Sequence, residues 1–240
     1  MSPALGPRPA LARHVRACEV DGQVILLDLL ADRYLGIPQR SGLAQAIDGW
    51  PGNPVVDSGT TGQRDLDGVA ATLARRGLLV DAPTGTPHTV RPIASPSRSL
   101  DALATTGDVH VGPGLFGRFL LSAVTTGWTL RHRSLLDISA SLDAARGAAG
   151  ARGADKVSGE LTTLVAVYEH LRPLVFTARD NCLYDSLALH RFLALNGVDA
   201  TWVIGVRVRP FGAHSWLQVG DTVLNDQRDH VLQFRPILVV

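Results

Sequence analysis

The sequence predicts an α+β protein with a small winged-helix-like N-terminal domain and a larger domain in which a helix packs on an antiparallel sheet. Short strand patterns alternate with helical patterns over 1–84, proline is frequent in 85–99, and the last quarter of the chain has a helical apolar pattern followed by strand patterns. The 240 residues, 45% of them hydrophobic, are enough for two cores. We therefore expect domains at 1–84 and 100–240, joined by a linker at 85–99.

The N-terminal domain is expected to begin with a β-hairpin. Apolar runs flank Asp21-Gly22, and Asp-Gly is a favoured two-residue hairpin loop. Pro38 can open a helix and Gly77 can end one. The further elements that we expect are a strand at 33–37, a helix from Pro38 to about Ile47, a helix from Leu66 to Gly77 and a strand at 78–80.

The region after this domain is expected to be a linker and then helical. Four prolines lie among Thr, Ser and Gly between Asp81 and Ser99, a composition that packs poorly. Helical patterns follow over 115–142 and 161–171. Between them, 146–153 is rich in glycine and is expected to be a surface loop.

The last part of the chain has the clearest patterns. Apolar positions predict a helix that begins near Cys182, with Asp180 or Asn181 as its N-cap, and ends at Asn196-Gly197. Three strands are expected to follow, at 201–208, 214–219 and 222–226.

The composition argues against several classes of function. The 23 Lys+Arg and 22 Asp+Glu give a formal net charge of +1, and 1–84 holds eight Arg against nine Asp+Glu, so a nucleic-acid partner is not expected. Cys18 and Cys182 lie far apart, which favours neither a disulfide framework nor a metal site. The chain shows no signal-peptide pattern and no apolar stretch of transmembrane length. We expect a cytoplasmic protein without a membrane partner.

Cys182, His214 and Asp226 follow one another in the order of a nucleophile, a base and an acidic orienting group. A free thiol is only a few per cent thiolate at neutral pH, so a catalytic cysteine needs an imidazole and often a helix N-terminus. Amide groups at that N-terminus can also stabilise an oxyanion, and Asn181 is our candidate there. A helix that carries the thiol and packs on a sheet that carries His and Asp is the arrangement of papain-like and transglutaminase-like enzymes.

Each of these residues also has an ordinary structural interpretation. Taken alone, Cys182 could be a buried hydrophobe, His214 a core histidine and Asp226 the end of a strand. Their order within 45 residues favours a site. A zinc site from the same side chains lacks a fourth ligand at a recognised spacing, so no metal and no cofactor is expected. The other histidines, His230 among them, are given no role.

The chain resembles the lasso-peptide biosynthesis B proteins. The resemblance runs in order through Cys182–Leu189, Val203–Arg207, Pro210–Trp216 and Val223–Asp226. It implies a transglutaminase-like cysteine peptidase in which Cys182 is the nucleophile, His214 the general base and then acid, and Asp226 the group that orients the imidazole. Asp185 departs from the family, which often has arginine there; the departure concerns substrate contact and not the triad.

The N-terminal strands Val24–Asp28 and Arg33–Ile37 resemble a leader-recognition domain that also occurs as a pyrroloquinoline-quinone chaperone. Together the two resemblances imply removal of the leader from a ribosomally made precursor peptide, which frees the core N-terminus for an ATP-dependent lasso cyclase. The leader would add as a strand beside 33–37. The residues expected to contact it are Arg33, Tyr34, Leu35, Val69 and Leu73.

Two alternatives stay open from the sequence alone. The first is an acyltransferase that uses the same triad with an amine as acceptor, and the second is a non-catalytic peptide-binding module. The precursor sequence, the cleavage position and the oligomeric state are not encoded in any pattern that we recognise.

Strand alternation adds a geometric expectation. If Gly220-Asp221 formed a plain two-residue turn, Ser215 would lie opposite Asp226, and His214 would point to the other face. We therefore expect a three-residue loop or a bulge that shifts the register by one residue. A regular hairpin with Asp226 turned away would make Asn225 the next candidate for the orienting group.

Overall fold

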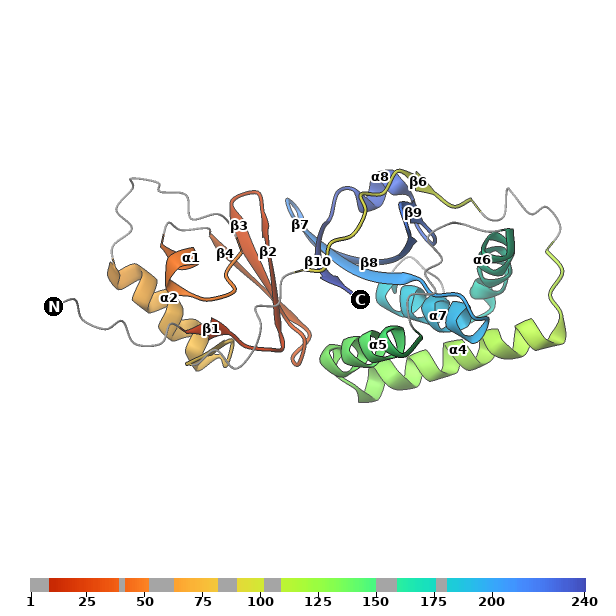
Figure 1. Ribbon diagram of the computed structural model, residues 1–240, viewed down its shortest axis with the longest axis horizontal. Helices are drawn as coiled ribbons and strands as arrows, with labels where there is room; N and C mark the ends of the chain where they lie inside the picture. The colour runs from red at the N-terminus through yellow and green to blue at the C-terminus, as the bar shows by residue number, and fades with distance from the viewer. Residues whose placement is uncertain are drawn as a thin grey trace. The chain divides into compact units, whose positions relative to one another are not determined.

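The computed structural model describes residues 9–38, 42–51, 63–81, 90–101, 109–149, 159–175 and 181–240. Residue contacts divide the chain into two units, 1–90 and 91–240. Both units combine helices with mostly antiparallel sheets, so the predicted α+β class is confirmed (Figure 1). Within the described residues, no helix is both long enough and apolar enough to cross a membrane.

The first unit is built around a three-stranded antiparallel sheet. Its strands are β2 (Val15–Val20), β3 (Gln23–Asp28) and β4 (Arg33–Pro38), in that order. Val20 pairs with Gln23, and Asp21 and Gly22 have positive φ angles of 49° and 72°, so the predicted Asp-Gly hairpin is confirmed. Among the described strands, β4 pairs with β3 on one side only, so it is an edge strand of this sheet.

Among the described residues of this unit, two helices and a small second sheet accompany the three strands. They are α1 (Leu43–Ala46), α2 (Gln63–Arg75), β1 (Ala10–Leu11) and β5 (Leu79–Val80), with β1 antiparallel to β5. Gly77 has a φ of 72°, and the Leu78 N–H bonds to the Leu73 carbonyl at 2.9 Å. The predicted end of this helix at Gly77 is therefore confirmed. The helix expected from Pro38 is limited to α1 in the described residues, which exclude 39–41.

The second unit contains a five-stranded sheet in the order β10-β7-β8-β9-β6. Its strands are β6 (Arg98–Ser99), β7 (Thr201–Val208), β8 (Phe211–Val219), β9 (Thr222–Val223) and β10 (Arg235–Val239). Only β6 runs parallel to its neighbour. The predicted strand at 201–208 is confirmed, whereas β10 was not predicted.

The end of the expected linker belongs to this sheet. Arg98 pairs with Thr222, and the Ser97 N–H donates to the Asp221 carbonyl at 2.8 Å. The linker prediction is therefore wrong for 97–99. An edge strand of two residues is too short to show a periodic pattern in the sequence. Pro96, which has no N–H to donate, lies before the strand, where no hydrogen bond to a neighbouring strand is required of it.

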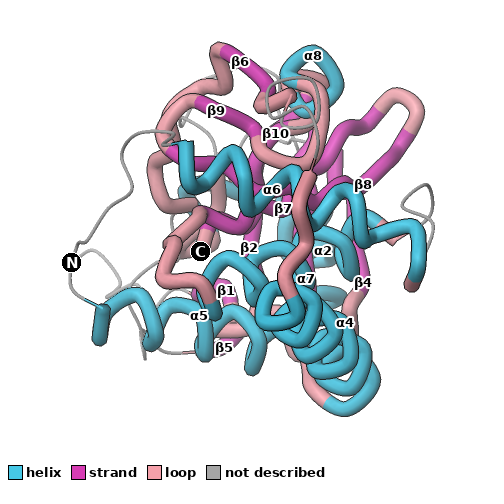
Figure 2. Tube along the Cα trace, turned by 90° about the vertical axis from the view of Figure 1, so that its right-hand side faces the viewer, coloured by secondary structure: helices cyan, strands magenta, loops and turns pink. Residues whose placement is uncertain are grey.

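Helices cover the sheet of the second unit. They are α4 (Pro113–His132), α5 (Leu135–Ala149), α6 (Gly159–Leu171), a 3-10 turn η1 (Arg172–Leu174), α7 (Cys182–Leu195) and α8 (Arg228–Val231). Helix α7 contacts β8 as well as α4 and α6. Figures 1 and 2 show α4, α5 and α7 on one side of the sheet and α8 on the other.

The glycine-rich segment 146–153 was expected to be a loop, but α5 continues through Ala149. The Arg146 side chain donates to Asp199 at 3.2 Å and to the Ala200 carbonyl at 3.0 Å. These tertiary contacts offset the cost of a glycine within the helix. Residues 150–153 lie outside the described residues.

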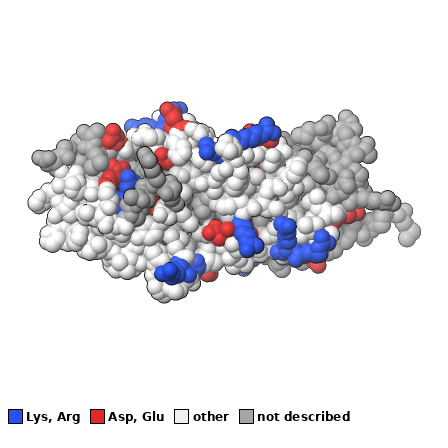
Figure 3. Space-filling model, turned by 180° about the vertical axis from the view of Figure 1, so that it is seen from behind, with Lys and Arg blue, Asp and Glu red and all other residues white. Residues whose placement is uncertain are grey.

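Charged side chains of both signs are interspersed with uncharged surface on the face of the molecule that Figure 3 shows. This distribution accords with the formal net charge of +1.

Candidate active site

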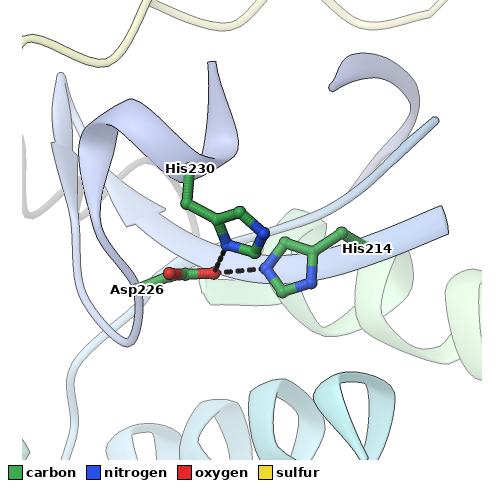
Figure 4. Close-up of side chains that lie close together, drawn as sticks. All are labelled: His214, Asp226 and His230. Atoms are coloured by element: carbon green, nitrogen blue, oxygen red, sulfur yellow. Dashed lines mark hydrogen bonds and ion pairs between the residues drawn. The ribbon is translucent and has the colours of Figure 1, made fainter. Parts of the chain in front are cut away.

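The structure brings the three predicted catalytic side chains together in the second unit. Cys182 is the first residue of α7, His214 lies on β8, and Asp226 lies in the bend after β9. The Nε2 atom of His214 hydrogen-bonds to Oδ2 of Asp226 (Figure 4). The Cys182 thiol and the His214 ring also lie close enough for each to shift the pKa of the other. Because Nε2 faces Asp226, Nδ1 is the ring nitrogen left for the thiol.

Cys182 occupies the N-terminus of its helix because Asn181 is the N-cap. The Asp185 N–H donates to the Asn181 carbonyl at 2.9 Å and closes the first turn. The Asn181 side chain is exposed and makes no capping hydrogen bond. The thiol therefore lies beside helix N–H groups that have no intrahelical acceptor, and these favour negative charge. A role for Asn181 in holding an oxyanion remains a proposal.

The predicted shift of the hairpin register is wrong. Val219 pairs with Thr222 and Gln218 with Val223, so Gly220-Asp221 is a regular two-residue turn. Asp226 nevertheless reaches His214 because β9 ends at Val223 and the chain then bends.

A side chain stabilises that bend. The Leu224 N–H donates to the Leu217 carbonyl at 2.9 Å. The Leu217 N–H donates at 2.9 Å to the side-chain oxygen of Asn225 and not to a backbone carbonyl. At Asn225, a side chain thus takes the place of the backbone acceptor that would continue the β8–β9 pairing. The next residue, Asp226, is not part of a strand, so its side chain need not follow the alternation of strand side chains between the two faces of the sheet.

The electrostatics of the Cys182–His214 pair favour a thiolate beside an imidazolium. Burial raises the pKa of Cys182, but its polar and charge interactions with His214 and the N–H groups of Ser215 and Leu183 prevail and lower the pKa below its usual value. Burial lowers the pKa of His214, but the hydrogen bond that it donates to Asp226, its interaction with Cys182 and the charges of both groups raise it to about 9. Both shifts increase the share of the ion pair at neutral pH.

Asp226 is held as a carboxylate. Burial raises its pKa, but hydrogen bonds from His214, His230 and the Gln227 N–H prevail and keep the pKa below its usual value. An ionised carboxylate can only accept hydrogen bonds, so Nε2 of His214 carries a proton. Nδ1 of His214 can then exchange a proton with the thiol, as a general base requires.

A buried hydroxyl cluster joins the helix of the nucleophile to the strand of the base. Ser186 lies one turn after Cys182, and Ser215 follows His214 directly. Their hydroxyl oxygens are 2.7 Å apart, and the Trp202 indole N–H points at them from 2.8 Å (Ser215) and 3.1 Å (Ser186).

A second polar bridge joins the same helix to the bend. The Asn225 side chain donates to the Asp185 carboxylate at 3.0 Å. Asp185 is 3% exposed, and it also accepts from the Tyr168 hydroxyl at 3.2 Å and pairs with Arg172 at 3.5 Å. Its burial raises its pKa despite these partners. Asp185 is the position at which the resemblance leads us to expect arginine. In this structure its side chain is buried, bonds to Asn225 and anchors the bend.

His230 also lies at the site, although no role was predicted for it. Its Nδ1 bonds to Oδ2 of Asp226 at 2.8 Å, the oxygen that His214 also contacts (Figure 4). The only signal in the sequence was the spacing of four residues after Asp226. The ligand atoms of His214, Asp226 and His230 lie within 4.8 Å of one another, a set that could hold a metal ion. Hydrogen bonds among the three already use these atoms.

The residues expected to bind a leader lie in the first unit. Arg33, Tyr34 and Leu35, on β4, line one pocket of about 470 Å³. Its remaining lining residues are Leu26, Asp28, Ala31, Arg76 and Leu78. Val69 and Leu73 lie on α2 and do not line the pocket; Leu73 is 1% exposed, so the expectation that it contacts a leader is wrong. An apolar helical position is more often core than docking surface.

The reactivity of the thiol tests the electrostatics. At pH 7 we expect iodoacetamide to modify Cys182 several-fold faster than free cysteine, because the lowered pKa increases the thiolate fraction. His214→Ala should reduce the rate well below that of wild type, since burial, which raises the pKa, would then be opposed only by the N–H groups of Ser215 and Leu183. Peptide mass spectrometry separates Cys182 from Cys18, which is buried. Equal rates for wild type and His214→Ala would contradict the ion pair.

Comparisons with known proteins find two similarities. A 48-residue segment is 50% identical to the Microcin J25-processing protein McjB of Escherichia coli, which covers 20% of this chain and 23% of that protein. The chain thus matches about a quarter of the length of that relative. The similarity supports the expected resemblance to the lasso-peptide B proteins; nothing compared supports the resemblance of the N-terminal unit to the quinone-cofactor chaperone. No solved structure matches.

The family comparison covers the whole described site. The model of the transglutaminase-like superfamily matches residues 120–239, half of the chain, and this range includes Cys182, His214 and Asp226. The chain therefore belongs to the transglutaminase-like superfamily.

Proposed function

We propose that the protein is a cysteine peptidase that removes the leader from a ribosomally synthesised lasso precursor peptide. The observation that carries the proposal is the grouping of Cys182, His214 and Asp226: the imidazole bonds to the carboxylate and interacts with a thiol at a helix N-terminus. The similarity to a protein named for processing a peptide supports the choice of substrate class.

The geometry supports a covalent mechanism in two halves. Nδ1 of His214 takes the thiol proton, and the Cys182 sulfur attacks the carbonyl carbon at the end of the leader. N–H groups near the start of α7 stabilise the oxyanion. His214 then gives its proton to the departing nitrogen, so the core peptide leaves with a free α-amine and the leader stays as a thioester. Water, deprotonated by His214, hydrolyses the thioester and releases the leader with a free carboxylate.

Leader binding is proposed for the first unit. β4 is an edge of its three-stranded sheet, and an extended peptide can add to such an edge through main-chain hydrogen bonds. The pocket beside β4 offers apolar contact from Leu35 and a cation from Arg33. The free α-amine of the core is the group that a partner ATP-dependent cyclase would join to a carboxyl side chain.

The first test is removal of the nucleophile. Cys182→Ala should reduce precursor cleavage to below a tenth of wild type and leave precursor affinity within about twofold, because the proposed docking strand lies in the other unit. Mass spectrometry measures cleavage, and fluorescence anisotropy measures binding. The mass of the released leader also separates hydrolysis from acyl transfer, because transfer would leave an amide on the leader.

A chelator provides the matched control for this test. Since His214 activates a thiol in the proposed mechanism, EDTA should leave the rate unchanged, whereas iodoacetamide should abolish it. Cleavage that survives in Cys182→Ala but is lost in EDTA would contradict the proposal and favour a hydrolase that uses the His214, Asp226 and His230 ligands.

The second test concerns the docking strand. Tyr34→Ala should raise KM for the precursor about tenfold and leave kcat unchanged, because the side chain lines the pocket beside β4 and is remote in sequence from the thiol. Glu19→Ala is the matched control, since Glu19 is exposed on β2, the opposite edge of the same sheet. Equal KM values for the two variants would contradict docking at β4.

A further inference from the structure

His230 lies where it can control the direction of the Asp226 carboxylate. It is on α8, four residues after Asp226, and its Nδ1 is 2.8 Å from Oδ2 (Figure 4). The other carboxylate oxygen, Oδ1, accepts the Gln227 N–H at 2.6 Å. Asp226 thus has three donors, and its two imidazole partners share one oxygen.

The protonation of His230 follows from its partner. Because Asp226 is an ionised acceptor, the proton in the contact lies on Nδ1 of His230, which donates. The Gln227 N–H comes from the next residue of the chain and holds only Oδ1. Without His230, only His214 itself would hold Oδ2, among the contacts of the described residues. His214, which Asp226 is proposed to orient, would then be the group that holds Asp226 in place.

Ring packing holds His230 in this position. Its ring centroid is 4.7 Å from that of His214 and 5.3 Å from that of Phe234, with an interplanar angle of 87° to the Phe234 ring. Phe234 also packs on His214, with centroids 5.2 Å apart. His230 is therefore placed by the segment α8 to Phe234, independently of Cys182. Its side chain is 44% exposed, so a substitution there removes little buried surface.

We propose that His230 is a positioning residue of the thiol site, whose Nδ1–H holds the Asp226 carboxylate toward His214; the inference rests on the proposed function. It acts through Asp226 and His214 and does not touch the reacting atoms. Loss of the donor leaves the Asp226 side chain free to turn, which reduces the time that His214 spends directed at Cys182.

The test is the rate at which iodoacetamide modifies Cys182 in the full-length chain, at pH 7 with EDTA present. His230→Leu, which has no donor, should lower the rate about tenfold, as expected for the loss of one hydrogen bond to a charged group. His230→Asn should restore it to within about twofold of wild type, because the amide nitrogen of Asn can occupy the place of Nδ1. A residue with only a packing role would show the reverse order, since Leu fills the space better than Asn.

Controls separate this inference from the proposed function. His170→Leu replaces an exposed histidine at the end of α6 and should leave the rate unchanged. Thermal unfolding confirms that each variant is folded. If wild type reacts fast and His230→Leu reacts equally fast or faster, the role of His230 is refuted and the peptidase proposal stands. If wild-type Cys182 reacts no faster than free cysteine, the proposed function itself is refuted.

Discussion

The site depends on two buried polar bridges that fix α7 against the β8–β9 hairpin. Ser186 meets Ser215, and Asp185 meets Asn225. In each bridge, the partner on the hairpin is the immediate neighbour of a triad member, and the partner on α7 lies within about one turn of Cys182. A buried hydrogen bond contributes only about 0.5–1.5 kcal/mol net, but leaving one partner unpaired costs more. The bridges therefore select one register of helix on hairpin, and that register sets the thiol beside the imidazole.

Apolar packing holds the imidazole from its other sides. Trp216 stacks near His214 with centroids 6.1 Å apart, and Phe234 lies across the ring. Gly205, which pairs with His214 across β7 and β8, leaves room for them: a Cβ there would lie 2.8 Å from a Trp216 ring carbon and 2.9 Å from the Phe234 Cβ. The side chain of His214 is 14% exposed and that of Asp226 is 18% exposed. In such surroundings the charges of the site are screened less than they would be in water, which strengthens the pKa shifts.

Features set by local sequence could be predicted. The start of α7 at Cys182, its end at Asn196-Gly197 and the Asp21-Gly22 turn follow from caps and turn residues. The hairpin register was predicted wrongly because β9 ends at Val223 and does not continue to Asp226. The bend at 224–226 depends on the Asn225 side chain, whose partner Asp185 lies 40 residues away in sequence. His230 and β6 were missed for the same reason, since each acquires its role only through a tertiary contact.

The measurement that tests this account most directly is the iodoacetamide rate of Cys182 in an Asn225→Ala variant. Asn225 contacts neither Cys182 nor His214 in the hydrogen bonds described; it bonds the Leu217 N–H and the Asp185 carboxylate. If the bridges set the register, the folded variant should react about as slowly as His214→Ala, because Asp226 loses its place. An Asn225→Ala protein that is folded and reacts at the wild-type rate would contradict the account.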